Sequence, residues 1–390
     1  MKFAAESPRF LAEKIRWAVQ GVASRPAMPV LAGLMITAST DGLVRFSGFD
    51  YDVGATADAQ AMVARPGSAL ISASLLANIM RALPDKPVAF TLEKGDQLAE
   101  IRCGPAMFQL ASIPLSGYPS LPELPAPAAR VSSDDLSRLV SRVAFAACRD
   151  ANAPAALNGV HTRVSDGALL MTATDRYRLA SGGVACEMLG GDGLPSMLIR
   201  ADALDRFAKV LPGGTAVDLS VDTGSDGAAS LAGFTAGGLS LSVRLLSGEF
   251  PDASARKLLD MPVSATAVMD SAAVAEAVAR AEVVMMPSGG VLVTFTSGEA
   301  TVTGSDGEGA REEETFPCEF DGDGPVTIRV NPKFLRAAVE AVRDERVAVE
   351  FTSGGSARIV VRAHVPPAAH RSDVLAYRHV LMPIKAGDSR

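Results

Sequence analysis

Three times in this chain, a glycine in a strand-like context is followed eight residues later by an aspartate. The pairs are Gly42 and Asp50, Gly167 and Asp175, and Gly298 and Asp306. Each pair spans a turn, a β-prone run and a small polar corner. The repeat recurs at about 128 residues, which is too long for a solenoid and has the size of a small domain. The sequence therefore predicts three similar domains in a row, which we place at residues 1–124, 125–255 and 256–390.

Two helical patterns recur in step with these strands. Apolar residues three or four positions apart predict a first helix in each domain, around Leu11 to Ala18, Leu136 to Val143 and Val274 to Ala281. The same spacing predicts a second helix around Leu76 to Leu83, Leu204 to Leu211 and Leu335 to Val342. Candidate N-caps are Ser7, Ser133, Asp202, Asp270 and Asn331. Alternating runs between the helices predict strands, so each domain is expected to be α+β, with two helices on an antiparallel sheet.

Composition is typical of a folded soluble protein. The chain has 390 residues, of which 48% are hydrophobic and 21% are charged. Its first residues lack the apolar core of a signal peptide, and no apolar run approaches membrane-spanning length. We therefore expect a cytoplasmic protein without a membrane partner. The four cysteines show no paired spacing, which favours free thiols over a disulfide or zinc framework: Cys103, Cys148, Cys186 and Cys318.

The charge distribution leaves two interpretations open. A formal net charge of −7 opposes indiscriminate binding to nucleic acid. Basic residues nevertheless fall on the non-core faces of the predicted helices: Arg9, Lys14, Arg16, Arg138, Arg142, Arg206, Lys209, Lys333, Arg336 and Arg343. If the helices line one surface, it can bind a phosphate backbone without reading base sequence. The alternative is that these are ordinary solvated helix faces.

No group of residues indicates catalysis, a cofactor or a metal. The repeat places Asp50, Asp175 and Asp306 in separate domains, so we interpret them as turn residues. The four histidines show no metal-ligand spacing: His161, His364, His370 and His379. The acidic run at residues 312–314 cannot turn every carboxylate toward one ion and is interpreted as a solvated outer strand or loop. We therefore predict a protein that is not an enzyme.

Five short motifs, in this order, carry a resemblance to a known family. They are the start MKF, the run from Arg25 to Leu31 (RPAMPVL), ATDRYRL from Ala173 to Leu179, GEFP from Gly248 to Pro251, and YRHVLMP from Tyr377 to Pro383. With the three repeats, the chain resembles the β sliding clamps of bacterial DNA polymerase III over essentially its whole length. The ATDRYRL form is typical of actinobacterial members.

The resemblance implies a ring that encircles double-stranded DNA. Two subunits would join head to tail as a homodimer, with the helices lining the hole and the sheets outside. Residues matching DNA-contacting positions are Arg25, Arg81 and Arg149. Ser74, Ala151, Ala155 and Ala156 depart from the larger or basic residues familiar in the family. Ring closure would rest on Phe108 and Leu110 against Val283 and Val284, for which plain core packing is the alternative.

The resemblance also implies a groove that binds short peptides of the polymerase III alpha subunit, the clamp loader and other clamp-motif proteins. The matching residues are Leu157, Thr174, Arg176, Tyr177, Arg178, Leu179, Pro251, Lys257, Leu258, Ser356, Val380, Leu381 and Met382. The segment from Ala253 to Lys257 departs from the family and is interpreted as a short insertion at the rim. It motivates the hypothesis of a divergent second clamp that tolerates a groove-binding antibiotic. A monomeric scaffold that forms no ring is the further alternative.

Overall fold

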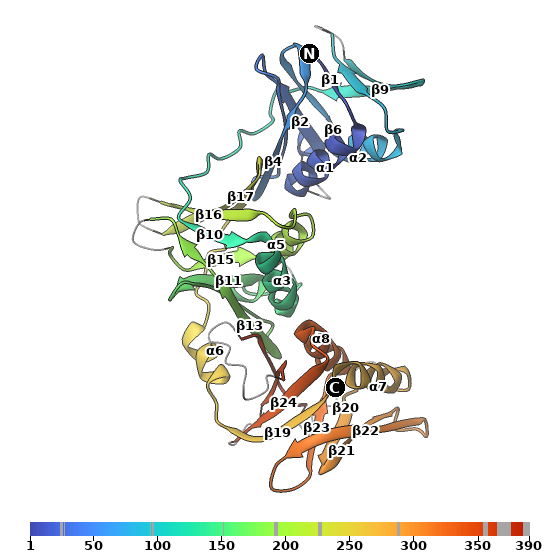
Figure 1. Cartoon of the computed structure of the whole chain (residues 1–390), viewed down its shortest axis with the longest axis vertical. Coiled ribbons are helices and arrows are strands. Elements are labelled where there is room, and N and C mark those ends of the chain that lie inside the picture. The colour runs from blue at the N-terminus through green and yellow to red at the C-terminus, as the bar shows by residue number, and fades with distance from the viewer. Residues whose placement is uncertain are drawn as a thin grey trace. The chain divides into compact units, whose positions relative to one another are not determined.

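The computed structural model describes residues 1–23, 26, 28–93, 95, 97–150, 152–190, 194–224, 228–286, 289–353, 358–364 and 376–384. Figure 1 shows the whole chain, which divides into two compact units. Unit 1 comprises Met1–Ser137 and Cys186–Leu246, and unit 2 comprises Arg138–Ala185 and Ser247–Arg390. The middle of the three predicted domains thus contributes to both units. The predicted limits at 124 and 255 remain a prediction.

Unit 1 contains one antiparallel sheet of 14 strands in the order β14-β10-β16-β17-β18-β4-β3-β2-β6-β9-β8-β7-β1-β5. The strands are β1 (Lys2–Ala5), β2 (Gly33–Ala38), β3 (Leu43–Phe49), β4 (Val53–Gln60), β5 (Met62–Arg65), β6 (Gly67–Ser72), β7 (Val88–Thr91), β8 (Leu98–Cys103), β9 (Ala106–Ile113), β10 (Ala129–Ser132), β14 (Glu187–Met188), β16 (Ala216–Thr223), β17 (Ala229–Ala236) and β18 (Leu239–Arg244). β15 (Met197–Arg200) also belongs to this unit. The pairing of β4 with β18, Ala55 opposite Leu241, joins the first predicted domain to the second.

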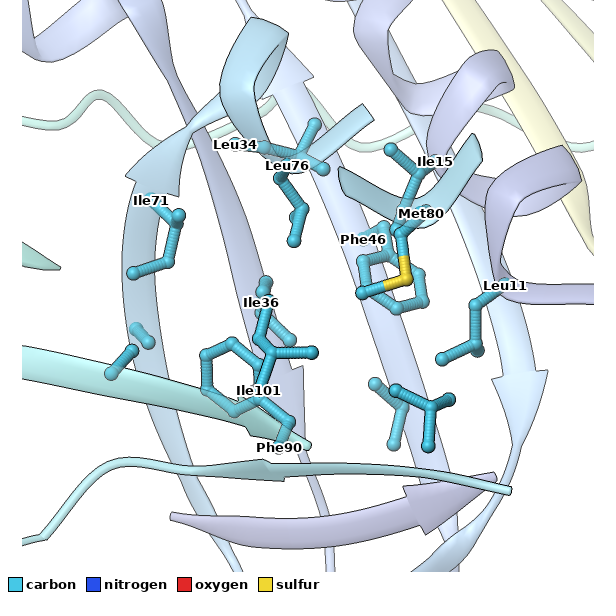
Figure 2. Packing of buried hydrophobic residues seen from close by; sticks show 14 of the residues in the cluster. Leu11, Ile15, Leu34, Ile36, Phe46, Ile71, Leu76, Met80, Phe90 and Ile101 are labelled. Atoms are coloured by element: carbon cyan, nitrogen blue, oxygen red, sulfur yellow. The ribbon is translucent and has the colours of Figure 1, made fainter. Parts of the chain in front are cut away.

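Helices α1 (Pro8–Ala18) and α2 (Ala73–Ala82) cover this sheet with their apolar faces. Figure 2 shows Leu11 and Ile15 of α1 and Met80 of α2 packed beside Phe46 and Phe90 of the sheet. All five side chains are at most 4% exposed. Burying a side chain of this size stabilises a fold by about 1.5–3 kcal/mol, so the predicted 3.6-residue periodicity corresponds to the core of the unit.

Unit 2 contains the strand order β11-β12-β13-β26-β25-β24-β19-β22-β21-β20-β23. The strands are β11 (Gly159–Ser165), β12 (Ala168–Thr174), β13 (Arg178–Ala185), β19 (Val263–Asp270), β20 (Val291–Thr296), β21 (Gly298–Ser305), β22 (Arg311–Asp321), β23 (Val326–Val330), β24 (Arg346–Thr352), β25 (Ile359–Ala363) and β26 (Arg378–Leu381). Each described pair is antiparallel. The last strand, β26, therefore lies between β13 and β25 and joins the second predicted domain to the third.

The predicted helices are confirmed, and the part of the chain that the structure describes also contains two α-helices that were not predicted. Besides α1 and α2, the structure has α3 (Ser133–Val143), α5 (Ala201–Ala208), α7 (Ser271–Val283) and α8 (Pro332–Val342) at the expected places. The additional helices are α4 (Ala155–Asn158) and α6 (Asp252–Leu259). Ser7, Asp270 and Asn331 are N-caps as predicted. The other two predictions are wrong: Ser132 accepts the capping bond of α3 from the Asp135 N–H, and Asp202 lies inside α5.

The repeated aspartates are turn residues, as the sequence predicts. Asp50, Asp175 and Asp306 each accept hydrogen bonds from backbone N–H groups two and three residues ahead. The residue after each aspartate has a left-handed backbone: φ is 75° at Tyr51, 80° at Arg176 and 79° at Gly307. The short carboxylate side chain thus closes the same turn in all three repeats.

Candidate functional site

An apolar cluster in unit 2 contains the centre of the predicted groove. Leu179 of β13, Val380 of β26, Val360 of β25 and Ala255 of α6 are each at most 4% exposed and pack together. Phe250, Leu258 and Leu259 are partly buried against them. We call these seven residues the apolar cup. The cup arises because β26 pairs with both β13 and β25, which places Val380 opposite Leu179 and Val360.

The sheet divides the remaining groove residues between two faces. Arg178 and Leu381 are directly opposite each other in the β13–β26 ladder, next to the pair formed by Leu179 and Val380. Successive side chains of a strand point to opposite faces, so Arg178 and Leu381 lie on the face away from the cup. Their place in the peptide groove stays a prediction. The identity of neighbouring residues in a motif does not show which face each one takes.

A tight turn leads from β12 to β13 beside the cup. The Thr174 hydroxyl donates to the Arg178 carbonyl at 2.7 Å and accepts from the Arg176 N–H at 3.2 Å. Arg176 and Tyr177 are exposed, and the Tyr177 carbonyl accepts from the Met382 N–H at 2.9 Å. Leu157 of α4 and Met382 are half-buried. This part of the predicted groove therefore presents an exposed aromatic ring and an exposed cation.

Arg178 is held by a set of contacts that the sequence analysis did not predict. Its Nε donates to Asp175 at 2.9 Å, and Nη2 donates to the Phe145 carbonyl at 2.7 Å. Its guanidinium carbon lies 5.2 Å from the centre of the Phe145 ring and 4.5 Å from that of Phe334. We call Arg178, Asp175, Phe145 and Phe334 the Arg178 cluster.

A buried polar pair lies beside the Arg178 cluster. His379 is fully buried on β26, stacks on Phe145 and shares a 2.9 Å hydrogen bond between its Nδ1 and the Tyr377 hydroxyl. Burial lowers the pKa of His379 to about 3, and the nearby Arg178 charge acts in the same direction. His379 is therefore neutral at pH 7. Arg142 approaches the Tyr377 ring from α3 and donates to the Val342 carbonyl of α8 at 2.8 Å.

The segment interpreted as an insertion at the rim is helix α6. Ala255 is buried in the cup, whereas Ala253 and Lys257 are exposed. Since residues two apart on a helix point in different directions, Lys257 does not face the cup. The start of α6 is anchored by Phe250, whose ring stacks on His161 at 4.8 Å, and by Asp252, which lies 3.6 Å from His161 Nδ1. Pro251 is exposed, and Ser356 lies outside the described residues.

The predicted DNA and subunit contacts are only partly accessible. Arg81 and Arg149 are exposed, and Arg25 lies outside the described residues. Val283, at the end of α7, is 83% exposed, and Val284 is half-buried. Leu110 is 2% exposed and belongs to the core of unit 1, against which Phe108 packs. The Leu110 side chain is therefore core packing, the alternative given above. In an interface between subunits, Leu110 could take part only through its backbone.

Within the ranges that the structure describes, no group of three or more His, Cys, Asp or Glu side chains is placed to hold a metal ion. No helix among those residues is long and apolar enough to cross a membrane.

The chain matches family models along most of its length. Models of the DNA polymerase III beta subunit match as N-terminal domain over residues 1–122, central domain over 130–252 and C-terminal domain over 257–370. The solved structure of the Pseudomonas aeruginosa clamp bound to griselimycin has a TM-score of 0.86 at 21% identity and covers 99% of this chain and 100% of that one. The Bacillus subtilis clamp structure has a TM-score of 0.85 at 23% identity and covers 99% of each chain.

Curated relatives are similar at higher identity. The beta sliding clamp of Streptomyces coelicolor is 31% identical and covers 96% of this chain and 97% of its own. That of Micrococcus luteus is 35% identical over 82% of this chain and 100% of its own. The beta sliding clamp homolog GriR of Streptomyces muensis is 32% identical over 99% of each chain. Together with the three clamp repeats, these matches show that the chain belongs to the beta sliding clamp family, the DNA polymerase III beta subunits, and has the three-domain α+β clamp fold.

Proposed function

We propose that this protein is a DNA sliding clamp and processivity factor. Two copies close head to tail around double-stranded DNA and tether the replicative polymerase through the groove of unit 2. The three repeats carry the proposal, because each one combines two helices with antiparallel strands, as a ring built from similar domains requires. The protein holds its partners on DNA and catalyses no reaction itself.

Two sheet edges support ring closure. Residues 106–111 of β9 pair with β8 on one side, and only Ser112 and Ile113 pair with β6 on the other. Residues 311–317 of β22 pair with β21 alone among the described strands. An open strand edge is a template for pairing with another chain. One edge lies in unit 1 and the other in unit 2, so pairing β9 of one copy with β22 of the next is a heterologous contact that can close a ring.

The charges of these edges favour the head-to-tail pairing. β22 carries Glu312, Glu313 and Glu314, and like charges opposed across two β22 strands would be destabilising. β9 contains no acidic residue. Glu312 Oε2 is buried and has no hydrogen-bond partner among the described residues, and burial with the neighbouring Glu314 raises the pKa of Glu312. An interface that supplies a donor to this carboxylate would satisfy it.

A protein that is held on DNA because it encircles the duplex needs only weak contacts with the phosphate backbone. Several helix cations already have acidic partners: Arg206 with Asp202, Lys209 with Asp205 and Arg336 with Glu282. These pairs reduce the attraction of the helices for phosphate. Arg81 and Arg149 remain exposed and are proposed to contact the DNA backbone, together with Arg25. A clamp that encircles DNA needs only such weak contacts, and they leave it able to slide.

The groove is proposed to bind a short peptide with apolar and aromatic anchors. The apolar cup includes the half-buried Leu258, and Tyr177 adds an exposed ring. Leu157 and Met382 are also half-buried and are proposed to extend the groove. Methionine adapts its shape to different occupants. The proposed partners are the polymerase III alpha subunit, the clamp loader and other clamp-motif proteins, which would compete for one site.

The deciding experiment is retention on DNA. The protein is loaded onto nicked circular DNA by the clamp loader of its own organism, and retention is measured before and after the circle is cut. A sliding ring is retained on the circle and lost after linearisation. Equal retention on linear and circular DNA, or none while the ordinary clamp of that organism is retained in parallel, would refute the proposal.

A second candidate function is that of a specialised clamp that tolerates an antibiotic directed at the groove. It is favoured by α6, which forms one wall of the cup, and by the 32% identity with GriR over 99% of both chains. The test is the affinity for griselimycin, measured by calorimetry beside the ordinary clamp of the same organism. Binding at least tenfold weaker than that of the ordinary clamp supports the specialised function, and equal affinity excludes it.

A further inference from the structure

The third residue after the turn aspartate is charged in the second repeat and uncharged in the other two. Three residues after the turn aspartate, the first repeat has Val53, which is 1% exposed, and the third has Gly309. The second repeat has Arg178, whose side chain is only 14% exposed. Burying a guanidinium is costly unless its charge and its donors are satisfied. The substitution within the repeat therefore needs a specific structural reason.

The contacts of Arg178 supply that reason. The carboxylate of Asp175 and the carbonyl of Phe145 accept two of its hydrogen bonds, and the rings of Phe145 and Phe334 lie within 5.2 Å of its guanidinium carbon. Guanidinium groups suit such places because they combine fixed donors with a flat surface that stacks on aromatic rings. Two of its five N–H donors and its contacts with two rings are thus taken by protein groups.

These contacts join two elements that are far apart in the sequence. Asp175 belongs to the turn between β12 and β13, and Phe334 lies in the first turn of α8. The start of α8 is itself fixed, because the Asn331 side chain accepts from the Lys333 and Phe334 N–H groups at 3.0 and 3.3 Å. Arg178 thus holds the turn against a rigid helix end.

The position of this turn sets the shape of one wall of the groove. Leu179 of the cup follows Arg178 directly and points to the other face of the sheet. Thr174, Arg176 and Tyr177 precede it in the same turn. A shift of the turn would therefore move the cup and its rim together.

We propose that Arg178 is a positioning residue of the groove, which locks the turn at residues 174–177 onto α8 and does not itself contact the bound peptide. This inference rests on the proposed function, because it assumes that the groove binds a peptide. It assigns Arg178 a different role from the direct contact that the family resemblance implies.

The test uses full-length variants and two labelled peptides. The variants are Arg178→Met, Arg178→Lys, Phe334→Leu and the double variant Arg178→Met/Phe334→Leu. Arg346→Met is the matched control, because Arg346 also donates to a carboxylate in unit 2, that of Glu319 at 2.7 Å. The probes are two short fluorescein-labelled peptides with leucine and phenylalanine anchors. They differ only in one residue, aspartate or asparagine, and affinities are read by fluorescence anisotropy.

If Arg178 is a positioning residue, its replacement should lower the affinity for both peptides equally, whatever their charge. Arg178→Met should weaken both peptides by the same factor, about tenfold, which is about 1.4 kcal/mol. Arg178→Lys should not restore binding, because an ammonium group lacks the planar fork. The double variant should bind no more weakly than Arg178→Met alone, since both changes remove the same contact. The control should bind like the wild type.

The failures are distinguishable. A loss confined to the aspartate peptide would make Arg178 a direct ligand and overturn the proposal, as would additive effects of the two single variants or unchanged binding by Arg178→Met. If the wild type binds neither peptide, the proposed groove function is refuted and the proposal with it.

Discussion

Removing the carboxylate of Asp175 should destabilise the protein more than removing that of Asp50, although the two residues close equivalent turns. Asp50 accepts two backbone hydrogen bonds, from Asp52 at 3.0 Å and Val53 at 2.7 Å. Asp175 accepts the two equivalent bonds and also pairs with Arg178 at 2.9 Å, with both side chains at most 14% exposed. The repeat therefore provides its own control for the ion pair.

The expected magnitudes follow from these contacts. Two backbone hydrogen bonds contribute about 1–2 kcal/mol, which is the expected loss for Asp50→Ala. Breaking a buried ion pair from one side costs about 3–5 kcal/mol. Asp175→Ala loses the two equivalent backbone bonds as well as the ion pair and should cost about 4 kcal/mol. This is the low end of the summed ranges, because Arg178 keeps its bond to the Phe145 carbonyl and its ring contacts.

Urea unfolding measures both variants. Trp17, the single tryptophan, is 2% exposed in unit 1, so its fluorescence follows the unit that contains Asp50. Far-UV circular dichroism follows both units. All samples need one protein concentration, because assembly would shift the transition. A loss for Asp175→Ala that does not exceed that for Asp50→Ala would refute the reasoning, since the buried ion pair would then contribute nothing.

Three further predictions concern pH, packing and assembly. The folded pKa of His379 is about 3, below the unfolded value of about 6.5, so protons favour the unfolded chain and stability falls as the pH drops below about 6.5. Between pH 7.5 and 5.5, the free energy of unfolding measured with urea should fall by about 1.4 kcal/mol because of His379. The variant His379→Gln should lack this part of the pH dependence, and an unchanged pH dependence in the variant would contradict the prediction. Gly304→Ala should cost about 2–3 kcal/mol, because the new Cβ would lie 2.4 Å from the Ala281 carbonyl of α7, against about 1 kcal/mol for Gly298→Ala, whose surroundings are open; equal shifts in thermal unfolding would exclude the packing argument. Val283→Asp should weaken the proposed dimer at least tenfold in sedimentation velocity, because the aspartate at this exposed position would place a charge in a desolvated interface. An unchanged dimer would show that Val283 is not part of that interface.

The elements were predictable where local chemistry decides them. The i, i+3, i+4 spacing of Leu11 and Ile15 recurs at Leu136 and Val274, and helices α1, α3 and α7 form there. The Gly-to-Asp repeat located three equivalent turns, because glycine tolerates a left-handed backbone and a short carboxylate bonds its own backbone. Helix α6 was not predicted, because it is short and only three of its apolar residues pack in the cup: Ala255, Leu258 and Leu259.

The residues of the apolar cup were only partly named from the sequence. Leu179, Val380 and Leu258 belong to the cup, and the groove residues predicted from the motifs did not include Val360, Ala255, Phe250 or Leu259. That the cup binds a peptide stays a prediction. The sequence analysis also assigned Arg178 to the groove surface. Alternation along β13 shows that Arg178 and Leu179 lie on opposite faces of the sheet. Only the folded structure shows that Leu179 packs against α6 and that Arg178 contacts α8.

The threefold repeat, its helices, its turns and the family resemblance could be read from the amino-acid order alone, because they depend on residues close together in the chain or on motifs in a fixed order. The place of the last strand, β26, could not, because it lies between β13 and β25, whose nearest residues, Ala185 and Ile359, are 174 positions apart in the chain. That pairing places Val380 beside Leu179 and creates the cup. Only folding also brings Phe334 to Arg178, because the burial of a cation depends on partners that no local pattern specifies.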